Sequence, residues 1–133
     1  MQFSIYRKAA VCAMLSLAWL AGCGPPPNVT AKGTVLRNNQ PVKMMSPNGY
    51  IQVTLKPDVP PNQEFTTKVG RCNPDGTFEV LDVPPGRYVV GIEHLDPNPV
   101  SDLLEGKLTY NFSKIKRDVD GKTPILIDLA KPE

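Results

Sequence analysis

The chain has 133 residues, which is enough for one domain and too few for two. Lysine and arginine total 15, aspartate and glutamate total 13, and the formal net charge is +2. A charge this small lacks the basic field that nucleic-acid binding needs, so we expect no nucleic-acid partner.

The first 22 residues have the three parts of a secretory signal. Arg7 and Lys8 form a charged start, and the uncharged apolar run Ala9 to Ala21 follows. This run is shorter than the about 20 residues that a membrane-spanning helix needs. We therefore predict an N-terminal signal helix within residues 1–22, which takes both excess positive charges with it.

The end of this segment carries a motif. Leu20-Ala21-Gly22-Cys23 resembles the lipobox of bacterial lipoproteins at all four positions. The resemblance implies cleavage between Gly22 and Cys23 and attachment of fatty acyl groups, such as palmitate, to Cys23. Two or three acyl chains hold a protein on a membrane, whereas one chain binds marginally. The lipobox resemblance also implies a cell-envelope location, and Gly24 after the cysteine favours the outer membrane or cell surface over the inner membrane.

Residues 23–28 are predicted to form a stiff tether after the acylated cysteine. Three consecutive prolines, Pro25 to Pro27, fix the backbone in an extended polyproline conformation. The remaining residues, 29–133, are then one domain held a short distance from the lipid.

Segments with a two-residue hydrophobic period indicate that this domain is all-β. Turn signals at Asn38-Asn39, Asn73-Pro74-Asp75-Gly76 and Val83-Pro84-Pro85-Gly86 separate these segments. The predicted strands are 29–36, 50–56, 64–72, 77–81, 87–95 and 124–129.

Alternation within these strands assigns inward positions. Predicted inward residues are Val29, Ala31, Gly33, Val35, Ile51, Val53, Leu55, Phe65, Thr67, Val69, Phe78, Val80, Tyr88, Val90, Ile92, Ile125, Ile127 and Leu129.

The region 96–123 is the hardest to interpret. We expect one helical turn over 101–105 with Ser101 as its N-cap, and a short strand over 107–112. Tyr110 and Phe112 lie on one face of that strand, which makes them the best candidates for an exposed contact, although we expect them to pack on the sandwich.

Four motifs resemble the carboxypeptidase regulatory-like domain over about residues 29–95. They are Ala31-Lys32-Gly33-Thr34-Val35, Ile51-Gln52-Val53, Asp75-Gly76-Thr77-Phe78 and Pro85-Gly86-Arg87-Tyr88-Val89-Val90. The resemblance implies a transthyretin-like or Ig-like antiparallel sandwich of about seven strands without catalytic activity. Tyr88 follows a corner, where its hydroxyl can bond to upstream backbone.

No residue set in the sequence indicates catalysis, a metal or a cofactor. His94 is the only histidine, and we expect it at the end of a strand, at the surface. A catalytic triad would have to pair it with Ser46, Ser101 or Ser113, and no nucleophile motif surrounds any of these serines. Zinc needs three or four ligands. Cys12 lies in the predicted signal and Cys23 is predicted to be acylated, so the mature domain offers only one histidine and the thiol of Cys72.

The stretches Asn73-Pro74-Asp75-Gly76 and Asp118-Val119-Asp120-Gly121 hint at calcium loops. A calcium loop of the EF-hand kind needs a carboxylate about six residues after its glycine. After Gly121 that position is Ile127, which cannot bind calcium. In the loop that contains Gly76, the first ligand position is Arg71. We interpret both as plain turns.

The sequence thus favours a membrane-anchored, non-catalytic sandwich that binds an envelope protein of unknown identity. A periplasmic small-ligand carrier is the alternative, and an enzyme using loop 96–123 is a third hypothesis.

Overall fold

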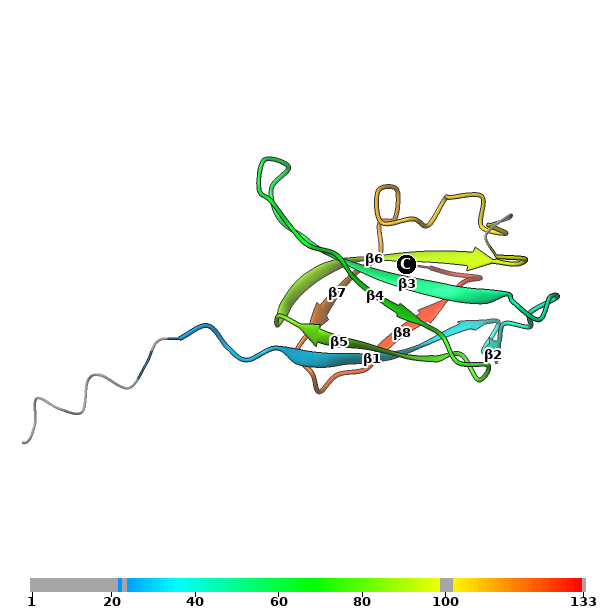
Figure 1. The fold of residues 1–133 in the computed structure, drawn as a ribbon, viewed down its shortest axis with the longest axis horizontal. Helices are drawn as coiled ribbons and strands as arrows, with labels where there is room; N and C mark the ends of the chain where they lie inside the picture. Colours follow the sequence, from blue (N-terminus) through cyan, green and yellow to red (C-terminus); the bar gives the residue numbers. More distant parts are fainter. Residues whose placement is uncertain (1–21, 23, 99–101, 133) are drawn as a thin grey trace, which may run out of the picture.

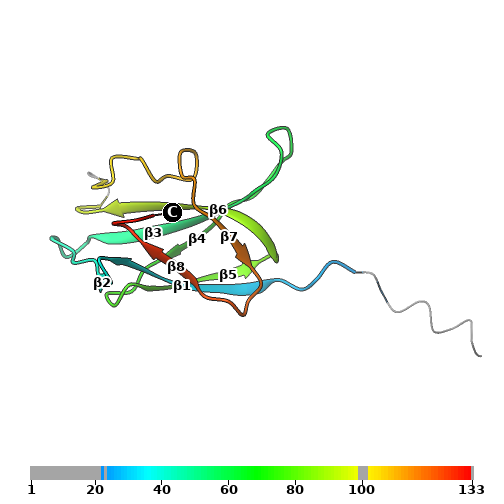
Figure 2. The same ribbon diagram turned by 180° about the vertical axis from the view of Figure 1, so that it is seen from behind.

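The computed structural model describes Gly22, residues 24–98 and residues 102–132. In this part the chain is all-β: eight strands form two sheets that face each other, and no helix is present (Figures 1 and 2). The predicted all-β sandwich is confirmed. The predicted signal helix and Cys23 lie outside the described residues.

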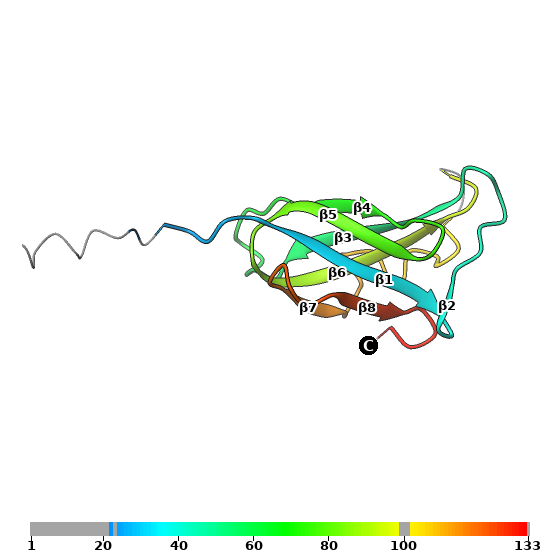
Figure 3. The same cartoon turned by 90° about the horizontal axis from the view of Figure 1, so that it is seen from below.

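The first sheet is built around β1 (Val29–Arg37). β5 (Thr77–Val83) pairs with it antiparallel and β8 (Ile125–Asp128) pairs with it parallel, so β1 lies between them (Figure 3). The prediction of a wholly antiparallel sandwich is therefore wrong for β8. An ideal Cβ on Gly121 would lie 2.8 Å from Val29 Cβ, so the loop before β8 passes the end where β1 begins. Both strands start from that end and must run in the same direction.

A tight hairpin joins β1 to β2 (Gln40–Pro41). Asn38 and Asn39 have φ angles of 52° and 61°. Two consecutive residues with positive φ match the twist of a two-residue hairpin, and asparagine tolerates this conformation better than most residues. The predicted Asn-Asn turn is confirmed.

The second sheet has the order β4-β3-β6-β7 and is antiparallel throughout. Its strands are β3 (Tyr50–Pro57), β4 (Lys68–Arg71), β6 (Gly86–Leu95) and β7 (Lys116–Val119). The β3–β6 ladder is the longest and runs from Tyr50 opposite Leu95 to Pro57 opposite Tyr88. β7 was not predicted as a separate strand.

Apolar side chains from both sheets fill the interior. Most predicted inward positions of β1, β3, β5, β6 and β8 are buried, which confirms the two-residue period. The buried apolar residues are Ala31, Val35, Ile51, Val53, Leu55, Phe78, Val80, Val83, Tyr88, Val90, Ile92, Ile115, Val119, Ile125 and Ile127.

Two predicted corners have the expected geometry. The Tyr88 hydroxyl donates a hydrogen bond to the Pro84 carbonyl at 2.7 Å, so the predicted tyrosine corner is confirmed. At the 73–76 turn, the Gly76 amide donates to the Asn73 carbonyl at 2.9 Å, and Gly76 has a φ of 85°.

The prediction for the β4 region is wrong in length and in register. β4 covers four residues only, and Phe65 and Val69 are 44% and 51% exposed instead of inward. The reason is a close approach of backbones: an ideal Cβ on Gly70 would lie 2.6 Å from the Glu79 carbonyl oxygen. Gly70 must face β5, and alternation then turns Val69 outward.

The segment 102–115 forms turns, so the short strand predicted over 107–112 is wrong. Its backbone bonds to the part of β6 that β7 leaves unpaired. The Val90 amide donates to the Ile115 carbonyl at 2.8 Å, and the Ile92 amide donates to the Leu108 carbonyl at 2.7 Å. The segment therefore protects a sheet edge.

A carboxylate shapes the start of this segment. Asp102 accepts hydrogen bonds from the amides of His94 at 3.0 Å, Leu104 at 3.0 Å and Gly106 at 2.8 Å. The described residues 102–105 form a turn and not a helical turn, and Ser101, the predicted N-cap, lies outside the described residues.

Segment 102–115 also crosses the outer face of the second sheet. An ideal Cβ on Gly91 would lie 2.5 Å from the Tyr110 amide nitrogen, so only a glycine fits beneath this backbone. Thr54, the β3 partner of Gly91, is 4% exposed although alternation predicts it on the solvent side. The covering segment explains this difference.

Candidate functional site

The base of the tether is fixed to the end of the sandwich. Residues 24–28 are exposed and leave the domain where β1 begins (Figure 1). The side-chain amide of Asn28 donates to Asp82 Oδ1 at 2.6 Å, and Lys68 Nζ lies 3.1 Å from Asp82 Oδ2. Hydrogen bonds from Asn28 and Lys68, together with the lysine charge, lower the pKa of the Asp82 carboxyl. The tether therefore has a defined exit point, while Cys23 lies outside the described residues.

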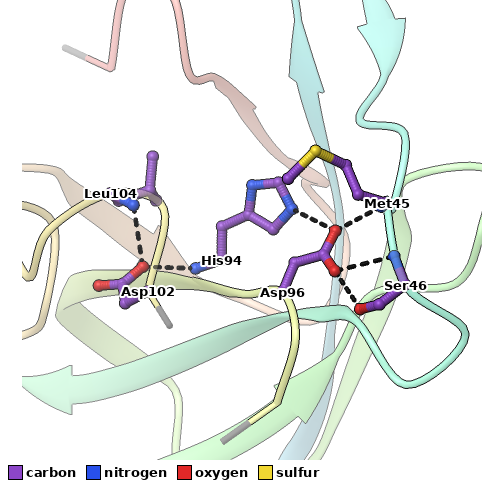
Figure 4. A network of polar contacts seen from close by, with 6 residues as sticks. All are labelled: Met45, Ser46, His94, Asp96, Asp102 and Leu104. Atoms are coloured by element: carbon purple, nitrogen blue, oxygen red, sulfur yellow. Dashed lines mark hydrogen bonds and ion pairs between the residues drawn. The ribbon is translucent and has the colours of Figure 1, made fainter. Parts of the chain in front are cut away.

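A second cluster of polar groups lies at the other end of β6, around Asp96 (Figure 4). Asp96 is 1% exposed and accepts hydrogen bonds from the Met45 and Ser46 amides and from the Ser46 hydroxyl. The Ser46 hydroxyl, then the Met45 amide, lower the pKa of this carboxyl. The carboxylate thus ties the loop after β2 to the end of β6.

His94 is buried, so the prediction of a surface position is wrong. It is 2% exposed, and within the described residues neither ring nitrogen has a hydrogen-bond partner. Its Nε2 lies 3.9 Å from Asp96 Oδ2. His94 has the same parity as Val90 and Ile92 on β6, so alternation points it into the sandwich.

Burial lowers the pKa of His94 below its ordinary value of 6.5. The charges of Asp96 and Asp102 oppose this shift, whereas the charge of Arg37 adds to it. Because burial is the largest cause, the imidazole is neutral at pH 7.

We expect the protein to lose stability as the pH falls below 6.5. The unfolded chain takes up a proton on His94 near that pH, whereas the folded chain does so only at lower pH. Urea unfolding at pH 7.5 and pH 5.0 measures the loss. His94→Phe keeps a ring and removes the titrating group, so its two free energies of unfolding should differ less than those of the wild type. Since His94 is the only histidine, an equal difference in both proteins would contradict this assignment.

The arrangement of Ser46, Asp96 and His94 does not match a hydrolase triad. In a triad the histidine lies between the serine and the carboxylate and accepts the serine proton. Here the Ser46 hydroxyl donates to Asp96. Ser113 donates to the Val90 carbonyl at 2.6 Å, and Ser101 lies outside the described residues. His94 therefore pairs with neither of the described serines.

Cys72 lines an open groove of about 680 Å³ between the loop after β2 and the end of β4. Tyr50 and Met44 also line it, and the Arg71 guanidinium lies 4.0 Å from the centre of the Tyr50 ring. Burial, with a smaller contribution from the Asp75 charge, raises the pKa of the Cys72 thiol to about 12. The thiol is protonated at neutral pH and is a weak nucleophile.

The two aspartate turns use their carboxylates internally, as plain turns do. Asp120 Oδ1 accepts from the Lys122 and Thr123 amides, each at 2.7 Å, and these bonds help to lower the pKa of Asp120 to about 2. Asp75 Oδ1 accepts from the Thr77 amide at 2.9 Å. Among the described residues, no group of three or more His, Cys, Asp or Glu side chains is placed to hold a metal ion.

Of the aromatic residues after Cys23, only Phe78 and Tyr88 belong to the buried core. Phe112 is 73% exposed, so the prediction that it packs on the sandwich is wrong. It borders an apolar hollow of about 460 Å³. We call its lining the Phe112 patch, and its residues are Lys107, Leu108, Phe112, Lys114, Ile115 and Pro132. The alternation of Tyr110 and Phe112 marks them as the best candidates for an exposed contact, and the structure bears this out for Phe112.

Comparisons of the chain with protein families, with curated proteins and with solved structures find no match. Both resemblances, to the lipobox and to the carboxypeptidase regulatory-like domain, therefore stay predictions. The described part of the chain also contains no helix with the length and apolar character that crossing a bilayer requires.

Proposed function

We propose that this chain is a lipid-anchored protein of the bacterial cell envelope, held on the outer membrane or cell surface through acyl groups on Cys23. The observation that carries the proposal is the order of features along the chain. A charged start, an apolar run and the motif Leu20-Ala21-Gly22-Cys23 precede a short proline tether. A folded domain starts directly afterwards at Val29. The bond between Asn28 and Asp82 supports this division between tether and domain.

The sandwich itself serves in this proposal as a non-catalytic module that binds another envelope protein. The tyrosine corner at Tyr88 and the glycine turns at Gly76 and Gly86 support a domain of the carboxypeptidase regulatory-like, transthyretin-like kind. The described Ser46 and Ser113 hydroxyls are bonded away from His94, and the Cys72 thiol is protonated. These contacts favour binding over covalent catalysis.

Replacing Cys23 with serine tests the anchor. We expect Cys23→Ser to abolish incorporation of labelled palmitate and to release the protein from membrane pellets, because serine cannot form the thioether. The other two cysteines supply matched controls, Cys12→Ser and Cys72→Ser. Cys12 lies in the apolar signal run, and Cys72 lies in the sandwich. Both controls should keep the label and the pellet location. Full labelling of Cys23→Ser would overturn the proposal.

The groove beside Cys72 favours a second candidate function, a small-ligand carrier. Its volume of about 680 Å³ is within the range of pockets that hold small molecules. Native mass spectrometry of the protein purified from envelopes tests this idea. A bound small molecule that is lost in Tyr50→Ala, and kept in the surface variant Lys32→Ala, would support a carrier. An unliganded mass would count against it.

A further inference from the structure

The Phe112 patch combines an apolar surface with positive charge. Leu108, Ile115 and Pro132 form its apolar part beside the exposed Phe112 ring. Lys107 and Lys114 are exposed and line it, and no acidic side chain is among its lining residues. Glu105, which pairs with Lys107, lies outside this lining. The lining itself therefore carries a net positive charge.

The patch lies within reach of the anchoring membrane. Asn28 is held to Asp82, so residues 23–27 are the free part of the tether, and five residues reach about 15 Å when extended as polyproline. β7 connects the patch at Ile115 to the loop beside Val29, a distance of about 20 Å along an extended strand. In Figure 2, β7 runs from segment 102–115 toward the tether exit. When the domain lies on its side, the patch and the tether exit are both close to the lipid, so the tether does not have to span the whole distance between them for Phe112 to reach the lipid surface.

We propose that the Phe112 patch docks on the anionic surface of the bilayer that holds the acyl anchor. An aromatic ring enters the interface between headgroups and acyl chains, and lysines beside it pair with lipid phosphates. This inference rests on the proposed lipid anchor. It adds a second, reversible membrane contact that fixes the orientation of the sandwich.

A single tryptophan tests the contact. The only tryptophan of the chain, Trp19, lies in the predicted signal, so Phe112→Trp gives the mature protein a single tryptophan, whose emission can be excited apart from that of the tyrosines. The acylated protein is reconstituted in vesicles of phosphatidylglycerol or phosphatidylcholine with brominated acyl chains. Leu126→Trp is the matched control, because Leu126 is 64% exposed on β8 of the other sheet.

We expect the tryptophan at 112 to shift its emission to the blue and to be quenched at least twice as strongly as the one at 126 in phosphatidylglycerol vesicles. Adding Lys107→Glu and Lys114→Glu should remove the difference, whereas Lys32→Glu with Lys43→Glu should leave it unchanged. Equal quenching at 112 and 126, or quenching that survives reversal of the patch lysines, overturns the proposal.

Failure of the anchor is read separately, by flotation of the protein with the vesicles and by its mass. If the chain carries no acyl group, the same variants are added to preformed vesicles. There, each lysine contributes about fivefold, so Lys107→Glu with Lys114→Glu should weaken binding by at least about 25-fold. Binding that is equal in all variants contradicts the patch even when the anchor proposal has already failed.

Discussion

Phe78→Ala is expected to lower the free energy of unfolding by about 4 kcal/mol, which is typical of a phenylalanine removed from a packed core. Phe78 is 1% exposed and pairs with Gly33 across the first sheet. Its loss leaves a cavity between strands that cannot collapse freely, because β1 is held on both sides by β5 and β8. Single domains have about 5–15 kcal/mol of stability, so this variant should lose a large share of it.

The same chemical change at Phe112 is the control for this experiment. Phe112 is 73% exposed, so Phe112→Ala should change the free energy of unfolding by less than about 0.5 kcal/mol. Urea unfolding followed by far-UV circular dichroism measures both variants. If Phe78→Ala loses as little as Phe112→Ala is expected to lose, then Phe78 is not part of the core.

The strands that the sequence predicts well are those in which alternation alone decides the outcome. Ile51, Val53 and Leu55 on β3 alternate with polar residues, and all three are buried as predicted. The turns at Asn38-Asn39 and Gly76 are local as well, since asparagine and glycine accept the positive φ that a tight turn requires. These features depend on neighbours in sequence and not on distant contacts.

The errors arise where a distant segment decides the local structure. Gly70 faces inward because the β5 backbone passes against it, and this reverses the register expected for Val69. The direction of β8 depends on where the loop around Gly121 passes β1. Neither contact leaves a periodic signal in the sequence.

The candidate sites divide in the same way. The anchor at Cys23 is predicted from four adjacent residues and a tether. The exposure of Phe112 depends instead on how segment 102–115 folds across β6, and a segment made of turns has no hydrophobic period. The burial of His94 depends on its place within β6. The sequence does supply one indirect signal for His94, since it continues the inward parity of Val90 and Ile92.

Gly33→Ala should be nearly as damaging as the loss of Phe78. An ideal Cβ on Gly33 would lie 2.3 Å from the Ile125 carbonyl oxygen and 2.5 Å from the Phe78 ring. Backbone cannot move aside as a flexible side chain can, so β1 and β8 must separate locally. We expect a loss of about 3 kcal/mol, at the upper end of the range for overpacked cores.

The two contacts of the added methyl group can be told apart by a double variant. Phe78→Leu makes room on the ring side only, so the combination Gly33→Ala with Phe78→Leu should recover part of the cost, while the clash with the Ile125 carbonyl oxygen remains. Gly24→Ala is the matched control, because a Cβ there meets nothing within 4 Å. Thermal unfolding of the four proteins gives the comparison. If Gly33→Ala proves as stable as Gly24→Ala, then β8 does not lie against β1 at this position, and the parallel pairing that closes the first sheet is wrong.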